Sequence, residues 1–179
     1  MLEAQPSSEE LMTLTSPSFA NGAYLPSTCA YEAENQSPIL AWTEVPAGAA
    51  SLALICEDID PSDTLPWTHW LLWNIPPNET MLPSGVSAYE HFPNGMDQGY
   101  NDFPELGWGG PCPPLGLHQY SFVLYALDCC IQPASRTRAD FLAALEGHVM
   151  ATASLTGFYE SENILVSYQR ARRGQALQL

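Results

Sequence analysis

The chain has 179 residues, with a hydrophobic fraction of 46% and only 14% charged residues, which is the composition of one globular domain with a sizeable core. Its formal net charge is −15 at pH 7, lysine is absent, and residues 1–135 contain no arginine. Such a chain cannot neutralise the phosphates of a nucleic acid, and an acidic membrane surface would repel it. We therefore expect neither nucleic-acid binding nor stable membrane insertion.

The N-terminus and the cysteines predict a cytoplasmic protein. Residues 1–20 are acidic and lack both the basic start and the apolar segment of a signal peptide. No later stretch is long and apolar enough to span a membrane. The five cysteines show no C-x-x-C spacing, which indicates neither a zinc ribbon nor a disulfide framework and favours reduced thiols.

Strand-like patterns dominate the first two thirds of the chain. Residues 1–50 contain frequent turn signals, such as Asn21-Gly22, and predict loops and short strands that wrap around a core. Stronger strand candidates follow at 51–56, 69–75 and 119–127. Each is apolar at nearly every position, so we expect both faces of each strand to be covered. We expect Leu54, Leu72, Phe122 and Leu124 to lie in the sheet core.

A long segment, residues 76–117, separates the second and third of these strands and is rich in proline, glycine, asparagine and aspartate. Structureless loops of this length are uncommon unless they carry a function. After the third strand, Thr137 to Asp140 has the spacing of a capping box, and the apolar periodicity that follows predicts a main helix over 139–153. Residues 156–160 are predicted to form a closing strand.

The last residues are predicted to form a tail outside the single domain, which we place at residues 1–162. The tail, residues 163–179, contains the apolar side chains Ile164, Leu165, Val166 and Tyr168. A compact monomer has no evident place to bury them, which favours a homodimer.

Two carboxylates follow the first strong strand. Asp58 and Asp60 flank Ile59, so in extended backbone both point to one face. No basic residue lies nearby in the sequence, so their partners must come from elsewhere in the fold. His69 lies in an apolar run, where burial lowers the pKa of an imidazole unless an acid is close. The alternatives are a solvated strand end for the two acids and a hydrogen-bonded core position for His69.

A stiff loop precedes the third strand. Prolines at 111, 113 and 114 fix φ, and glycines at 109, 110 and 116 permit turns that other residues cannot make. The loop leads into His118 and Tyr120, which alternate around Gln119 and should face the same side. The alternative is that the loop is merely a connection.

These features occur within five ordered segments. They are A-L-I-C-E-D-I-D-P at 53–61, W-T-H-W-L-L-W-N-I-P at 67–76, G-Y-N-D-F at 99–103, G-W-G-G-P-C-P-P-L-G-L-H-Q-Y at 107–120 and L-Y-A-L-D at 124–128. Together they resemble the phosphatidylethanolamine-binding proteins, in particular the bacterial and archaeal Raf-kinase-inhibitor-like branch of that family. Weaker matches extend the resemblance over roughly residues 14–160.

The resemblance implies a mainly β Greek-key fold, with a large antiparallel sheet packed against a smaller one and peripheral helices. It also implies a pocket for phosphate-like anions. The residues that would line this pocket are Asp58, Asp60, His69, Cys112, Pro113, His118 and Tyr120. The family implies no catalytic residue, no metal and no cofactor, because its members are ligand-binding or inhibitory regulators of kinases and proteases.

Two departures from the family pattern concern this pocket. Gln119 stands where an arginine is usual, and D-I-D-P-S at 58–62 replaces the usual D-P-D-A-P. Loss of the arginine weakens the attraction for an anion. We expect the acids to orient His69 and His118, and one acid to accept a proton from a phosphomonoester or from the ammonium of an ethanolamine head group. A phosphoethanolamine-type zwitterion would satisfy both signs of charge, with binding favoured below about pH 7.

Two other functions remain open from the sequence. The two aspartates and two histidines could hold a divalent metal and make the protein a metal-dependent hydrolase. Alternatively, the pocket has lost its ligand, and the exposed surface inhibits a protein partner such as a kinase or a protease.

Overall fold

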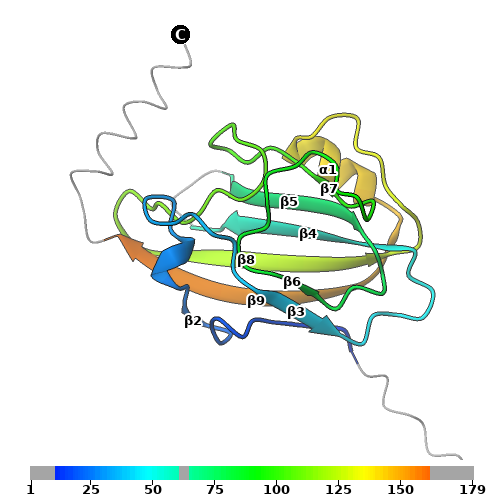
Figure 1. The fold of residues 1–179 in the computed structure, drawn as a ribbon, viewed down its shortest axis with the longest axis horizontal. Coiled ribbons are helices and arrows are strands. Elements are labelled where there is room, and N and C mark those ends of the chain that lie inside the picture. Colours follow the sequence, from blue (N-terminus) through cyan, green and yellow to red (C-terminus); the bar gives the residue numbers. More distant parts are fainter. Residues whose placement is uncertain (1–10, 61–64, 162–179) are drawn as a thin grey trace, which may run out of the picture.

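The strands of the computed structural model, which describes residues 11–60 and 65–161, form two sheets (Figure 1). The larger sheet has six strands in the order β2-β9-β8-β4-β5-β7, and the smaller has three in the order β1-β3-β6. Neighbouring strands are antiparallel except for β2, which pairs parallel to β9. The large-sheet strands are β2 (Ala23–Tyr24), β4 (Ser51–Asp58), β5 (Trp67–Ile75), β7 (Asp97–Gln98), β8 (Gly116–Leu127) and β9 (Val149–Ser161). The small-sheet strands are β1 (Thr13–Thr15), β3 (Leu40–Thr43) and β6 (Met81–Leu82).

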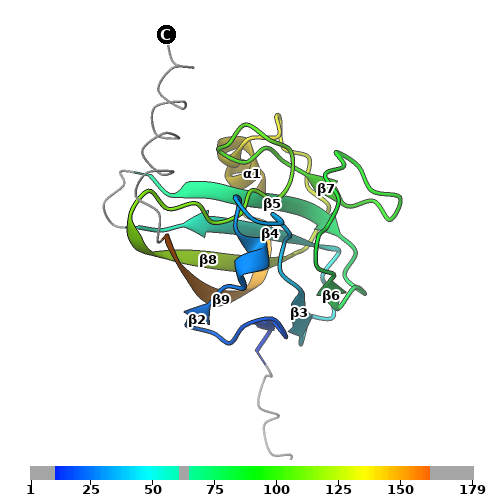
Figure 2. The ribbon, with the colours of Figure 1, turned by 60° about the vertical axis from the view of Figure 1, so that its left-hand side comes forward.

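Both faces of the large sheet are covered, as the apolar strand runs predicted. Leu52, Leu54 and Cys56 of β4 face a core shared with the small sheet, whereas Ala53 and Ile55 face a second core. The second core contains Phe141 and Leu145 of the helix α1 (Arg138–Leu145). Figures 1 and 2 show α1 and the small sheet on opposite sides of the large sheet. The four predicted core residues Leu54, Leu72, Phe122 and Leu124 are all fully buried.

The predicted helix over 139–153 is wrong in its second half. The helix begins where the capping spacing indicates, with Thr137 as its N-cap, but it ends at Leu145. Gly147 has φ +81°, a left-handed conformation that stops a helix, and β9 starts at Val149. Residues 149–155 are held by antiparallel pairing with β8, so a long strand replaces the short closing strand predicted at 156–160.

Several predictions lie beyond the described residues. The tail, the boundary after residue 162 and the homodimer inferred from the tail's apolar side chains all fall there. In the part of the chain that the structure describes, no helix has the length and apolar character needed to cross a membrane.

Candidate functional site

The ends of β4, β5 and β8 bring the predicted polar residues together. Asp58, the last residue of β4, lies opposite Tyr120 of β8 in the strand register. His118 precedes Tyr120 by two positions and therefore shares its face of the sheet, as predicted. Asp58 shares the strand face of Leu54 and Cys56, so its side chain extends the face that packs against the small sheet. The polar cluster thus lies at one end of the main core.

His118 lies between the two aspartates. Its Nδ1 is 2.7 Å from Asp58 Oδ2, and its Nε2 is 3.2 Å from Asp60 Oδ2. The backbone N–H of Asp60 donates to Asp58 Oδ1 at 3.1 Å, which keeps both acids on one side of the chain. Both ring nitrogens can donate only in the imidazolium form. The Asp58–His118–Asp60 cluster therefore carries one net negative charge when both acids are ionised.

His69 reaches the same site because β5 is irregular. The pairing of β4 with β5 shifts register between Cys56 and Glu57, so that His69 has no direct partner on β4. Such a bulge changes the direction in which a side chain points. The His69 ring meets the edge of Tyr120, with ring centroids 5.0 Å apart, although regular alternation from Trp70 would send it to the opposite face.

The partner of His69 is a backbone carbonyl rather than an acid. His69 Nδ1 lies 2.5 Å from Gly109 O, so Nδ1 donates and Nε2 keeps its lone pair. The expectation that Asp58 fixes the His69 tautomer is wrong, because Asp58 pairs with His118 instead. Burial lowers the pKa of His69, although the Gly109 hydrogen bond and the charge of Asp58 act in the opposite direction. The ring is therefore neutral at neutral pH.

This pKa predicts a loss of stability in weak acid. Below pH 6.5, the ordinary pKa of histidine, the unfolded chain binds a proton at position 69 that the folded chain does not. Stability should then fall with decreasing pH, by at most about 1.4 kcal/mol per pH unit from this one group. Urea unfolding between pH 7.5 and 5.5 should show a steeper decline for the native chain than for His69→Asn, whose amide can still donate to Gly109. Parallel curves for the two proteins would contradict the assignment.

The Tyr120 hydroxyl is fully buried, and within residues 11–60 and 65–161 it makes no hydrogen bond of standard geometry. Burial raises the pKa of Tyr120, and the charge of Asp58 raises it further. The side chain is therefore a neutral phenol with a proton to donate. A buried donor of this kind costs free energy unless a partner arrives.

The proline-glycine loop forms a rigid wall beside these residues. Gly109 N donates to His69 O at 2.9 Å, Gly110 N donates to Asn35 Oδ1 at 2.8 Å, and Pro111 O accepts from Tyr31 N at 3.0 Å. The segment is thus fixed to β5 on one side and to residues 31–35 on the other. This confirms that it is more than a flexible connection.

Two of the predicted site residues border a neighbouring cavity instead of the histidine cluster. Cys112 and Pro113 line a cavity of about 380 Å³ together with Glu32, Tyr159 and Glu160. Tyr159 lies opposite His118 in the β8–β9 register, so the cavity begins one strand away from the cluster. The sequence pattern did not indicate Glu32, Tyr159 or Glu160, because only the strand pairing and the loop contacts bring them here.

The chain matches a known family over most of its length. Residues 15–160 fit the family model described as phosphatidylethanolamine-binding protein. This chain is a member of the phosphatidylethanolamine-binding protein family. The resemblance inferred from the five sequence segments is thereby confirmed.

Similar members of the family come from archaea and bacteria. A UPF0098 protein of Methanothermobacter thermautotrophicus is 45% identical over 150 residues, which cover 83% of this chain and 98% of the relative. Among solved structures, a putative phosphatidylethanolamine-binding protein homologue of Chlamydia trachomatis, CT736, is 36% identical with a TM-score of 0.75, covering 85% of this chain and 99% of that one. Escherichia coli YbcL, described as a new member of the mammalian family, is 32% identical with a TM-score of 0.78, covering 86% and 100%.

In this family member, the described arginines lie away from the cluster. Arg138 pairs with Glu57, and Arg136 pairs with Glu90 and Asp97 while stacking over the Trp73 ring. Gln119, at the position where the family usually has arginine, uses its backbone carbonyl to accept from Ile59 N at 2.9 Å. In the described part of the chain, histidine is therefore the basic side chain at the site.

Proposed function

We propose that this protein binds a small phosphate-bearing ligand, an anion or a phosphoethanolamine-type zwitterion, beside Tyr120 and the Asp58–His118–Asp60 cluster. The observation that carries the proposal is the buried Tyr120 hydroxyl, which lacks an acceptor among the described residues. A phosphate oxygen is a suitable acceptor for it. The neutral His69 ring and the rigid wall at Gly109 and Gly110 would limit the ligand to a small head group.

Charge favours a zwitterion over a simple anion. The cluster holds two carboxylates for one imidazolium, so it attracts an ammonium group and repels a phosphate. A phosphoethanolamine head group would place its ammonium toward the carboxylates and its phosphate toward the Tyr120 hydroxyl. This arrangement requires no arginine, in agreement with glutamine at position 119.

We further propose that ligand binding serves regulation, with a protein kinase or protease as partner, and that the protein acts in the cytoplasm. The support for the regulatory role is family membership, and the support for a reducing compartment is that all five cysteines are free. Inhibition of a partner that persists when the head-group site is disabled would assign regulation to another surface.

Tyr120→Phe tests the binding site directly. The change removes a buried hydroxyl without a protein partner, so the unfolding free energy should stay constant or rise by about 1 kcal/mol. Affinity for phosphoethanolamine should fall about tenfold, because a hydrogen bond to a charged group contributes about 1.5–3 kcal/mol. Titration calorimetry at pH 6.5 measures the second effect. Unchanged affinity in a stable variant would remove the hydroxyl from the site.

A further inference from the structure

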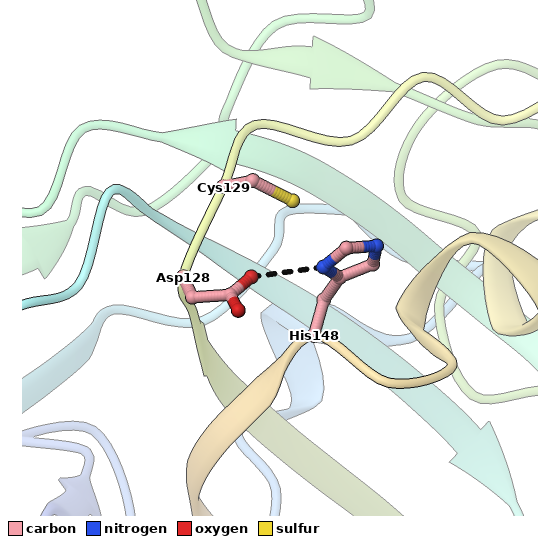
Figure 3. Close-up of side chains that lie close together, drawn as sticks. All are labelled: Asp128, Cys129 and His148. Carbon is pink, nitrogen blue, oxygen red and sulfur yellow. Dashed lines mark hydrogen bonds and ion pairs between the residues drawn. The ribbon is translucent and has the colours of Figure 1, made fainter.

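A second group of chemically reactive side chains lies beyond the far end of β8. Asp128 and Cys129 directly follow this strand, and His148 directly precedes β9 (Figure 3). One ligand atom from each of the three residues lies within 4.8 Å of the other two, and His148 Nδ1 is 2.9 Å from Asp128 Oδ1. Ten strand positions separate Asp128 from His118, which corresponds to about 33 Å along β8. This cluster is therefore independent of the head-group site.

We propose that Asp128, Cys129 and His148 form a binding site for a zinc-type divalent metal ion, with a fourth coordination position open to water. Thiolate, imidazole and carboxylate are the protein ligands that Zn²⁺ prefers. Tetrahedral coordination with bonds of about 2.0–2.3 Å sets the ligand atoms about 3.3–3.7 Å apart. The three donors already lie close to this spacing, and Figure 3 shows the thiol and the carboxylate directed toward the imidazole.

The backbone holds the three ligands in place before any metal arrives. Asp128 N donates to His148 O at 3.1 Å, which joins the two chain segments directly. The buried Ser51 hydroxyl donates to Cys129 O at 2.6 Å and fixes the cysteine. The β8–β9 register shifts after Ala126, and this irregularity precedes the ligands just as the bulge in β5 precedes His69. Binding therefore requires only small side-chain movements.

Charge and access also suit a divalent cation. Asp128 and His148 are exposed, so an ion can enter from solvent. On binding, the metal–sulfur bond forms as the Cys129 thiol releases its proton to solvent. The thiolate and the Asp128 carboxylate then balance the two positive charges of the ion, and His148 contributes a neutral nitrogen.

Cobalt(II) reports on this site because a bound thiolate gives a charge-transfer absorption in the near ultraviolet. We expect the full-length, reduced protein to bind one Co²⁺ per chain with this absorption, and added Zn²⁺ to displace the cobalt. Cys129→Ser should abolish the band. Asp128→Asn and His148→Ala should each weaken binding by at least the 10–100-fold that changes behind metal ligands typically cause.

Cys130→Ser is the matched control, because Cys130 is the next residue, is exposed and lies outside the group of three. It should keep the band, the stoichiometry and the zinc-induced rise in melting temperature, all of which Cys129→Ser should lack. Retention of the band in Cys129→Ser, its loss in Cys130→Ser, or binding only at millimolar cobalt would each overturn the proposal. A band that disappears in His118→Ala would transfer the metal to the other site and also overturn it.

Discussion

Replacing Gly110 by alanine should lower the unfolding free energy by at least about 3 kcal/mol, the upper part of the range for overpacked sites. A Cβ at this position would lie 1.9 Å from Cys29 O and 2.7 Å from Tyr31 N. Both are backbone atoms, so no side chain can move aside to relieve the contact. The proline-glycine loop must shift away from residues 29–31, and the wall beside His69 shifts with it.

Gly48→Ala is the control for that experiment. Its nearest neighbour would be Met150 Cε at 3.3 Å, the mobile end of an exposed side chain, and Gly48 does not have a positive φ. We expect a change within about 0.5 kcal/mol for this variant. Urea unfolding of both proteins decides the matter. Equal losses would mean that the close approach of Gly110 to Cys29 is not what stabilises the loop.

His118→Ala should abolish phosphoethanolamine binding and also destabilise the protein. The imidazolium lies between Asp58 and Asp60, whose side chains are only 8% and 16% exposed. Removing it leaves two poorly solvated carboxylates facing each other, a loss that typically costs about 3–5 kcal/mol. Calorimetry measures the loss of binding, and chemical unfolding measures the loss of stability.

The control uses the same substitution at an exposed pair. His148 and Asp128 form a similar contact, but their side chains are 46% and 53% exposed. His148→Ala, measured without added metal, should therefore cost no more than about 1 kcal/mol. If the two histidine variants lost similar stability, burial would not be what makes the Asp58–His118–Asp60 cluster important to the fold.

Local alternation predicted part of the site correctly. Asp58 with Asp60, and His118 with Tyr120, lie two positions apart in extended backbone, so each pair shares a face without any knowledge of the tertiary structure. His69 could not be placed in this way, because the bulge that turns it toward Tyr120 depends on how β5 pairs with β4. Its carbonyl partner, Gly109, lies 40 residues away, and no local pattern indicates such a contact.

The remaining errors also have a physical basis in long-range pairing. Residues 149–153 have apolar positions that suit either a helix or a strand, and hydrogen bonding to β8 selects the strand. The same pairing brings His148 to Asp128, which makes a cluster of residues that are 20 positions apart. Cys112 and Pro113 follow the rigid loop into the neighbouring cavity because Pro111 is fixed to Tyr31.

The strand order of the large sheet has a consequence for solubility. Its outermost strands, β2 and β7, contain only two residues each, whereas the central strands β8 and β9 contain 12 and 13. A long unpaired edge would offer a row of backbone donors and acceptors to another chain. Edges this short give an incoming strand little to pair with. The arrangement therefore protects the protein against edge-to-edge aggregation, and self-association through a continuous intermolecular sheet is disfavoured.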